Sequence, residues 1–292
     1  MARQVVADIV IHAPPAEVRR MAQAPEQHQR WDLRFSEISY LPRPDPGQPQ
    51  RFRYATRMGL WSVEGWGETV ADRDELGSGL RFGSDAPHSI IREGAGSWRY
   101  EAAPESVRFR TVYDYKVRGG ILGRLVDAVA FRPAIAWATR WSFDRLRLWL
   151  ERGLSPEAAL RTWLAKRTAL TLLGLVWILA GLLPKVTQVR PTEVDLVARS
   201  HLVVGSPAFT LAALGWAEAG LGLWLLWGRA PRLAALAATL AMAVLAGLVM
   251  ALDPAWASDP YSGLVKNLGL LACAATVWLL EEWSPKARRA KG

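Results

Sequence analysis

Two apolar runs fill residues 207–252, which read PAFTLAALGWAEAGLGLWLLWGRAPRLAALAATLAMAVLAGLVMAL. Each run reaches the roughly 20 residues that an α-helix needs to cross a hydrocarbon core about 30 Å thick. Slightly shorter runs lie on either side, TALTLLGLVWILAGLL (168–183) and GLVKNLGLLACAATVWLL (263–280). A buried helix of a soluble protein imitates one such run, but four in succession, joined by short polar loops, predict a membrane bundle. We predict spans at about 168–184, 207–227, 231–252 and 263–280.

The chain before these runs has the composition of a water-soluble domain, with charged residues spread throughout. This break in composition predicts two domains, 1–155 and 156–292. The N-terminal stretch MARQVVADIVIHAPP alternates apolar and polar residues and lacks a charged region followed by an apolar block, so we do not expect a secretory signal.

The clearest strand pattern lies at 107–118, where apolar, aromatic and threonine side chains alternate with mostly charged ones. Strict alternation over this length is typical of a half-buried antiparallel strand. The pattern recurs at 52–58 and around Trp98 and Tyr100, and more weakly at 5–11. Glycines predict turns at Gly59 and at 77–79 (the LGSG motif). Together these segments predict a meandering antiparallel sheet.

Two helical regions frame the predicted sheet. The first begins in APPAEV (13–18), because proline is tolerated in a first turn, and Pro25 breaks it. The second is a long amphipathic helix over 123–152, which Pro133 should kink or split. Its arginines and tryptophans suit a membrane headgroup region or a solvated basic face, and the sequence leaves both open. They are Arg124, Arg132, Arg140, Arg145, Arg147, Trp137, Trp141 and Trp149.

Several short motifs accompany this order of strand, short helices, sheet and long helix. They are VADIVIHAPPAEV (6–18), HQRWD (28–32), VEGWGE (63–68), GSW (96–98) and DRLRLWLERG (144–153). Over residues 1–152 the chain resembles the SRPBCC or polyketide-cyclase-like superfamily, which has the START-like, helix-grip fold. The resemblance implies an α+β domain whose antiparallel sheet wraps around the last helix and encloses an apolar cavity for a lipid, sterol, polyketide or other hydrophobic molecule.

Aromatic side chains of the predicted sheet are the candidates for contact with such a ligand. They offer a large apolar area together with a few hydroxyl and N–H groups. For each of them, filling of an ordinary core is the competing interpretation. The candidates are Tyr54, Trp61, Trp98, Phe109, Tyr113 and Tyr115.

Charged residues near the apolar runs mark internal pairing or function, because a charge in a bilayer is costly. Glu218 lies mid-run, Lys185 follows the first run, and Lys266 with Asn267 opens the fourth. Glu218 requires a partner or a proton, and a lysine that snorkels towards it would supply an ion pair. The alternatives are a proton- or quinone-linked site and a Glu218 that is protonated or exposed to water.

Three separated motifs carry a resemblance of residues 167–283 to the DoxX-like family of four-helix membrane proteins. They are GLVWILAGLLPK (174–185), GWAEAGLGL (215–223) and KNLGLL (266–271). The resemblance implies redox and oxidative-stress associations and a polar core at Lys185, Glu218, Lys266 and Asn267. A redox role would need a partner protein or a quinone, since the nearest histidine, His201, lies in a loop.

Other site chemistries lack a pattern in this sequence. The four histidines are scattered, without an HExxH motif or a cysteine companion, so we predict no metal site. The single cysteine, Cys273, forms no disulfide within the chain. The net charge of +9 comes without a nucleic-acid-binding motif. Asp32 beside His28 and Trp31 fits a capping and turn role better than a polar site.

The sequence therefore predicts a multi-pass protein of a bacterial inner membrane, with a helix-grip domain followed by an all-α bundle of four transmembrane helices. The positive-inside rule places both termini in the cytoplasm. The favoured function is binding of a hydrophobic small molecule or lipid beside the bilayer, with no catalytic residue and no cofactor assigned. The alternatives are a subunit of a quinone-linked redox complex and a cyclase- or dehydratase-like enzyme.

Overall fold

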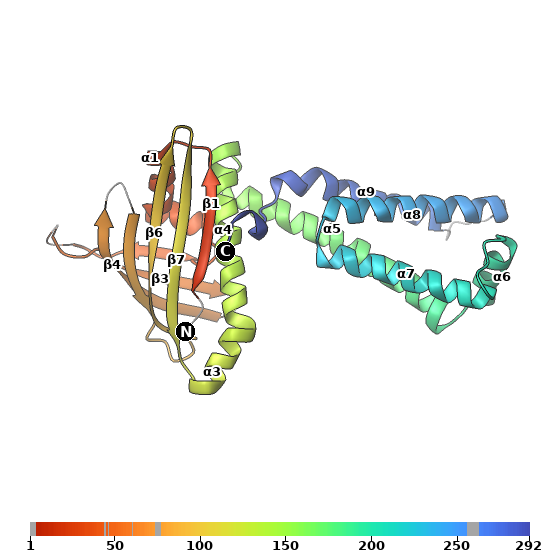
Figure 1. Cartoon of the computed structure of the whole chain (residues 1–292), viewed down its shortest axis with the longest axis horizontal. Coiled ribbons are helices and arrows are strands. Elements are labelled where there is room, and N and C mark those ends of the chain that lie inside the picture. Colours follow the sequence, from red (N-terminus) through yellow and green to blue (C-terminus); the bar gives the residue numbers. More distant parts are fainter. Residues whose placement is uncertain (1–3, 44, 46, 60, 74–76, 256–262) are drawn as a thin grey trace. The chain divides into compact units, whose positions relative to one another are not determined.

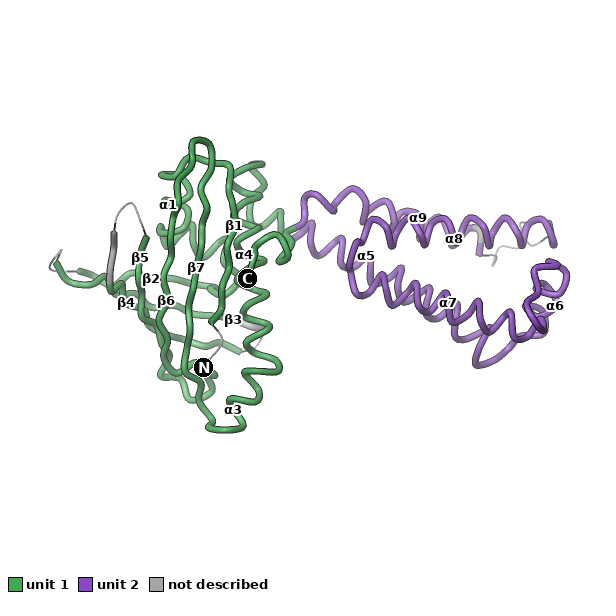
Figure 2. The backbone as a smooth tube through the Cα atoms, in the orientation of Figure 1, with its two compact units in different colours: residues 1–160, 285–292 green, residues 161–284 purple. Residues whose placement is uncertain are grey.

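A computed structural model describes residues 4–43, 45, 47–59, 61–73, 77–255 and 263–292. The chain divides into two compact units (Figure 2). Unit 1 comprises Met1–Leu160 together with Pro285–Gly292, and unit 2 comprises Arg161–Ser284. The predicted helix-grip domain falls in unit 1 and the predicted membrane bundle in unit 2.

Unit 1 is built on a seven-stranded antiparallel sheet of order β1-β7-β6-β5-β4-β3-β2 (Figure 1). Its strands are β1 (Val5–Ile11), β2 (Glu37–Tyr40), β3 (Arg51–Met58), β4 (Trp61–Arg73), β5 (Gly77–Gly83), β6 (Ile91–Ala103) and β7 (Ser106–Val117). Two short helices, α1 (Pro15–Gln23) and α2 (Pro25–Trp31), connect β1 to β2. Each starts with a proline in its first turn, where the missing N–H costs no hydrogen bond.

The alternation in β7 is confirmed, since Val107, Phe109, Thr111, Tyr113 and Tyr115 are all buried. The turn predicted at 77–79 is wrong, because these residues open β5 and pair with Ser97–Arg99 of β6. A glycine-rich segment serves here as a strand, which the turn propensity of glycine conceals from the sequence. Several glycines of the sheet also provide positions on which an aromatic ring of the neighbouring strand packs.

Glycines on the sheet lie under aromatic rings of the adjacent strand. A Cβ added to Gly65 would fall within the Tyr54 ring, and one added to Gly94 would meet the Phe82 ring. The same relation joins Phe52 to Gly67 and Trp66 to Gly83. Because glycine has no side chain, each ring lies flat on the sheet rather than standing upright from it.

The helical segment after β7 runs from Gly120 to Arg152 in three parts. They are α3 (Gly120–Val126), a π-helical turn η1 (Asp127–Phe131) and α4 (Arg132–Arg152). The expected interruption at Pro133 takes the form of this π-helical turn, which ends where α4 begins. Pro133 lies in the first turn of α4, so its missing N–H falls where the hydrogen-bond ladder already changes register.

The core of unit 1 lies between the sheet and α4. Phe109 of β7 stacks between Phe143 of α4, at a ring-centroid distance of 4.6 Å, and Tyr100 of β6, at 4.9 Å. Trp31 is fully buried and donates a hydrogen bond from Nε1 to the Met21 carbonyl, at 2.8 Å. These contacts fix α2 and α4 against one end of the sheet.

Residues 285–292 also belong to unit 1, although sequence analysis placed them in the membrane domain. Lys291 pairs with Asp8 of β1 through two backbone hydrogen bonds of 2.8 and 2.9 Å. The Lys286 amide donates to the buried Asp144 carboxylate at 2.7 Å, and Ala290 is 3% exposed. This C-terminal tail therefore pairs with the open edge of β1 at Asp8.

Unit 2 consists of helices. They are α5 (Pro156–Leu182), the π-helical turn η2 (Leu183–Thr187), α6 (Pro191–Arg199), α7 (Pro207–Trp227), α8 (Pro231–Leu252) and α9 (Gly263–Leu280). The first residues of α5 belong to unit 1. Two short 3₁₀ turns follow α9: η4 (Glu281–Trp283) in unit 2 and η5 (Ala287–Arg289) in unit 1. Among the residues that the structure describes, three helical stretches are long and apolar enough to cross a membrane: 156–187, 207–227 and 231–252. The fourth predicted span coincides with α9, and its crossing of the membrane stays a prediction. Most of the loop before it, 256–262, lies outside the described residues.

Helices α5 and α7 approach closely at two pairs of glycines. A Cβ on Gly174 would lie 2.8 Å from the Gly222 carbonyl oxygen, and one on Gly215 would lie 2.5 Å from that of Gly181. Backbone therefore meets backbone at both points, and the two glycines of each helix are seven positions apart in the sequence. Small residues at helix interfaces permit such packing in lipid, where dispersion forces and not the hydrophobic effect hold helices together.

Substitution of Gly215 by alanine should destabilise unit 2, because the new methyl group meets the α5 backbone and forces the helices apart. Overpacking of this kind costs about 1–3 kcal/mol. We expect a lower midpoint of thermal unfolding in detergent for Gly215→Ala than for the wild type. Gly220→Ala is the matched control, since a Cβ at Gly220 of the same helix meets no atom within 4 Å. Equal midpoints for the two variants would contradict this packing.

Candidate functional site

A cavity of about 1110 Å³ lies in unit 1, between the sheet, α2, the segment after α2 and the first turns of α4. Most of its lining is aromatic or aliphatic, including Phe52, Tyr54, Phe82, Trp98, Phe131 and Ile135. Small-molecule sites occupy roughly 300–1,000 Å³ and have a mainly apolar lining with few polar groups. The cavity is thus large enough for a lipid-sized molecule.

The structure brings together only part of the predicted aromatic set. Tyr54, Trp98 and Tyr113 line the cavity. Trp61 is 71% exposed on β4 and is not part of the lining. Phe109 lies in the core between Tyr100 and Phe143. Tyr115 is buried farther along β7, where its hydroxyl donates to Asp127 at 2.7 Å.

A polar cluster adjoins the cavity where α2 ends. Asp32 is 1% exposed, and its carboxylate accepts two hydrogen bonds from the Arg34 guanidinium, from Nε at 2.9 Å and from Nη2 at 2.6 Å. The same carboxylate contacts His28 Nε2 at 3.0 Å. His28 and Asp32 are four residues apart at the end of one helix, which places both side chains on the same side. The Leu33 amide, bonded to Ser142 Oγ at 2.8 Å, fixes the segment to α4.

Electrostatics of this cluster favour an ionised carboxylate and a neutral imidazole. Burial opposes charge on Asp32, but the Arg34 guanidinium outweighs it and holds the pKa of Asp32 well below its usual range. Burial also lowers the pKa of His28, an effect that the neighbouring Asp32 carboxylate only partly offsets. Because an ionised carboxylate only accepts, we infer that neutral His28 donates from Nε2 and keeps a lone pair on Nδ1.

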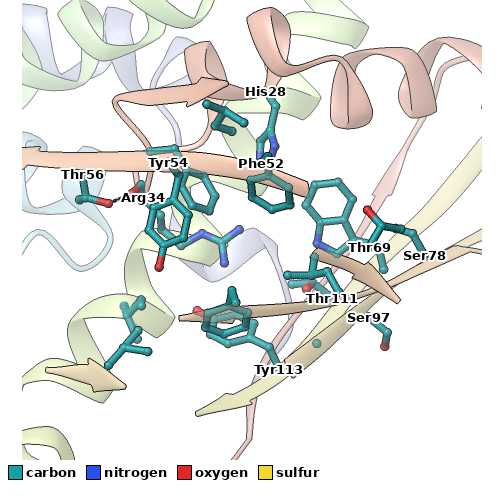
Figure 3. A pocket seen from close by; sticks show the side chains of 18 of the residues that line it. His28, Arg34, Phe52, Tyr54, Thr56, Thr69, Ser78, Ser97, Thr111 and Tyr113 are labelled. Carbon is teal, nitrogen blue, oxygen red and sulfur yellow. Dashed lines mark hydrogen bonds between the residues drawn. The ribbon is translucent and has the colours of Figure 1, made fainter. Parts of the chain in front are cut away.

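Arg34 extends from this cluster into the cavity, as Figure 3 shows for its guanidinium group between Tyr54 and Tyr113. Its Cζ lies 5.3 Å from the Tyr113 ring centroid, a cation–π contact. Thr56 Oγ1 holds the backbone by donating to the Arg34 carbonyl at 2.5 Å. Asp32 engages Nε and Nη2, and the Tyr113 hydroxyl also interacts with the guanidinium, so Nη1 is the nitrogen that Asp32 does not hold.

Two tyrosines complete the polar lining. Tyr54 donates to the Gly83 carbonyl at 3.2 Å, and burial raises its pKa to about 12. The Tyr113 hydroxyl shares a hydrogen bond of 2.8 Å with Thr139 of α4. The Tyr54 phenol is therefore neutral at physiological pH, and both hydroxyls act as hydrogen-bonding groups. Among the described residues there is no group of three His, Cys, Asp or Glu side chains that could hold a metal ion.

The polar residues predicted for the membrane domain separate into two sets. Lys185 Nζ and Glu218 Oε2 form an ion pair of 2.9 Å, beside the closest approach of α5 and α7. Lys266 and Asn267 on α9 make no side-chain hydrogen bond or ion pair with any residue that the structure describes. A second buried pair, Lys166 with Glu281 at 2.9 Å, was not predicted from the sequence.

Sequence reasoning missed the polar anchor of the cavity. It treated Asp32, His28 and Trp31 as a turn, and it did not select Arg34, which only follows them in the chain. An arginine two residues after a buried aspartate was the available signal.

The proposal that the arginines of 123–152 form a solvated or membrane-facing basic surface is wrong for Arg145 and Arg147, which are 6% exposed. Arg147 pairs with Asp144 at 2.7 Å, and Arg145 donates to the Pro156 carbonyl at 2.8 Å.

A sheet wrapped on a long helix, with an apolar cavity between them, defines unit 1 as a helix-grip protein, here in one chain with membrane-spanning helices. The chain belongs to the polyketide cyclase / dehydrase and lipid transport family, which residues 2–151 match. Residues 174–275 match the DoxX-like family. Both resemblances drawn from the sequence motifs are thereby confirmed.

Known proteins resemble different parts of the chain. An uncharacterized membrane protein of Bacillus subtilis strain 168, YndG, is 42% identical over 165 residues, which are 54% of this chain and 61% of that protein. Among solved structures, a protein from Thermus thermophilus is 21% identical, covers 50% of this chain and 97% of its own, and has a TM-score of 0.40. The Zhui aromatase/cyclase from Streptomyces sp. R1128 is 15% identical over 50% of this chain and 96% of its own, at a TM-score of 0.39.

Unit 1 should lose stability as the pH falls below 6.5, the ordinary pKa of histidine. In this range His28 is protonated in the unfolded chain, whereas in the folded chain burial lowers its pKa and keeps it neutral. A group whose pKa is lowered by folding stabilises the folded state above its unfolded pKa and loses this contribution as the pH falls. We expect His28→Gln to flatten the decrease in unfolding temperature between pH 6.5 and about pH 5. His88→Gln, at an exposed histidine, is the matched control. An unchanged pH profile for His28→Gln would contradict the assignment.

Proposed function

We propose that this protein binds a hydrophobic small molecule or lipid in the cavity of unit 1, beside the membrane to which the same chain is anchored. The observation that carries the proposal is a cavity of about 1110 Å³ whose mainly apolar lining includes the Arg34 guanidinium, held by the buried Asp32. An apolar molecule partitions into lipid, so a cavity tethered at the bilayer meets it at a high effective concentration.

The Arg34–Asp32 pair supports a ligand with an oxygen acceptor at one end. The pair carries no net charge, because the carboxylate neutralises the guanidinium through two hydrogen bonds. A carbonyl or hydroxyl oxygen can accept from Nη1 without an additional countercharge. The hydroxyls of Thr111 and Tyr113 belong to the same lining. The ligand that fits is therefore amphipathic, with a small oxygen-bearing end and a large apolar body.

A tryptophan in place of Ala138, which lines the cavity from α4, should fill part of the ligand volume. We expect Ala138→Trp to weaken binding of a fluorescent polyene fatty acid, cis-parinaric acid, by about tenfold or more. Ala16→Trp makes the same change on the exposed face of α1 and should bind like the wild type. Equal affinities of all three proteins, measured by titration of the full chain in nanodiscs, would argue against the cavity as the binding site.

A cyclase- or dehydratase-like reaction is the second candidate, and the ionisable His28 in the cavity lining is the observation that favours it. Native mass spectrometry of the purified full chain separates the two functions. A binding protein retains one molecule unchanged, whereas a dehydratase converts an added hydroxylated ligand into a product lighter by one water. Loss of that conversion in His28→Gln, with binding retained, would establish the enzyme.

The polar residues of unit 2 support a structural role more than a quinone site. Lys185 and Glu218 satisfy each other at 2.9 Å, and Lys185 also donates to the Ala180 carbonyl at 3.0 Å. A buried ion pair that already has its partners leaves no charge for a quinone to balance. We therefore assign this pair to the packing of α5 against α7.

The C-terminal tail supports a topology with both termini on one side of the membrane. Unit 1 contains the chain before residue 161 and again after residue 284, so the intervening chain crosses the bilayer an even number of times. In the described part of the chain three helices meet the requirements for crossing, and we propose α9 as the fourth. The positive-inside rule makes the shared side cytoplasmic, since Arg229 lies in the α7–α8 connection and Arg232 in the first turn of α8.

Reporter fusions test this topology. Green fluorescent protein joined to Gly292 should fluoresce in a bacterial host, because it folds on the cytoplasmic side. Alkaline phosphatase fused after Arg199, in the α5–α7 connection, should be active, because it requires the outer side. Phosphatase activity from a fusion at Gly292 would place the tail outside and overturn the proposed topology.

A further inference from the structure

Unit 1 carries an exposed apolar surface on α3 and η1. Five aliphatic side chains form it, with exposed fractions between 43% and 81%, and we call them the apolar ridge: Ile121, Leu122, Leu125, Val126 and Val129. No residue of α3 is buried. A seven-residue helix is marginal in water without packing, so this segment exposes apolar area and gains little from the rest of the unit.

The polar and apolar faces of this segment are inverted relative to an ordinary surface helix. Asp127 points inward, where it accepts hydrogen bonds from Tyr115 at 2.7 Å and from Arg132 Nε at 2.8 Å. The aliphatic side chains on either side of Asp127 point outward. A helix that faces water places its charged residues outside and its apolar residues inside. The inversion therefore indicates that the apolar ridge faces a medium other than water.

A bilayer surface is the medium that the rest of the chain supplies. Within the described ranges, three helices of the same chain are long and apolar enough to span a membrane, so lipid is always within reach of unit 1. Arg124 lies among the ridge residues and is exposed. A basic side chain within an aliphatic face matches a membrane whose headgroups are partly anionic, and aliphatic side chains enter the headgroup and acyl boundary.

The apolar ridge leads directly into the cavity. Phe131 follows Val129 by two residues, and Phe131 and Ile135 both line the cavity. The two surfaces are joined by the π-helical turn Asp127–Phe131, an irregularity that is frequent at functional sites. We propose that the apolar ridge enters the membrane surface and that the ligand passes between the bilayer and the cavity along it. The second part of this inference rests on the proposed function.

Spin labelling of the full chain in nanodiscs tests the membrane contact. In a Cys273→Ser background, a nitroxide is attached at Leu122→Cys, and the control label is attached at Glu105→Cys. Glu105 is exposed in the β6–β7 turn, at the opposite end of β7 from α3 (Figure 1). A strand of 12 residues such as β7 spans about 40 Å. The nanodiscs contain phosphatidylcholine and phosphatidylglycerol, with one protein copy each.

Contact with the bilayer should make the Leu122 label more accessible to oxygen and less accessible to a water-soluble nickel chelate than the Glu105 label. The double substitution Ile121→Asn with Leu125→Asn should lower the population ratio of the membrane-inserted ridge to the uninserted ridge by about tenfold or more. The reason is that insertion no longer transfers two aliphatic side chains from water into the bilayer. The fold of unit 1 should persist, since none of these residues is buried. Equal accessibility of the two labels to both reagents would overturn the proposal. If the labels show dipolar coupling, and only when two copies share a nanodisc, the contact partner of the apolar ridge is a second copy of the chain and not the bilayer.

The rate of cis-parinaric acid transfer from vesicles separates this inference from the proposed function. If the ridge is the entry route, the double asparagine variant takes up the probe more slowly while its equilibrium affinity stays that of the wild type. Equal uptake rates would overturn the entry route. A wild-type protein that inserts Leu122 but binds no probe would contradict the cavity function and leave the membrane contact standing.

Discussion

Close approach at glycine is the constraint on which both units depend. In unit 1, the rings of Phe52 and Tyr54 cover Gly67 and Gly65 of the next strand, so they occupy little of the space above the sheet. That space is the cavity, which the same two rings line. In unit 2, Gly174 and Gly181 of α5 face glycines of α7, and the two backbones meet. In unit 1 the missing Cβ atoms let the rings lie close to the sheet and leave space for the cavity. In unit 2 they let the backbones of α5 and α7 come into contact.

The cavity combines an apolar lining with one buried ion pair, and these features constrain each other. A lone guanidinium would be costly to bury, and Asp32 offsets that cost through two hydrogen bonds to Arg34. Aliphatic residues in place of the pair would serve stability equally well, because desolvation offsets much of the attraction between buried charges. The pair is therefore best understood through what it presents to the cavity, a single fixed donor edge. Tyr113 and Thr56 hold that edge in place.

The sequence predicts the parts of this molecule that repeat a pattern. Alternation over 107–118 identified β7 and its buried face, and length with hydropathy identified α5, α7, α8 and α9 but not α6, which lies in the predicted loop at 184–206. The strand β5 was missed because its glycines indicate a turn when read locally, and only the pairing with β6 makes them a strand. The site was harder to predict, since alternation reports which aromatics face inward but not which ones border a void. Tyr113 and Phe109 share a face of β7, yet one lines the cavity and the other is stacked in the core. Arg34 lies in a connection without periodicity, so no pattern selected it.

The C-terminal tail links the two units through the order of their synthesis. Residues 285–292 close the edge of β1 by pairing with Asp8 and bonding Asp144 of α4, and they are synthesised after every helix of unit 2. The partner of Asp8 on this edge is available only after the last helix of unit 2 has been made. Completion of unit 1 thus follows the translation of unit 2. A ribosome that stops early would leave an uncapped sheet edge, the feature by which β proteins associate wrongly with one another.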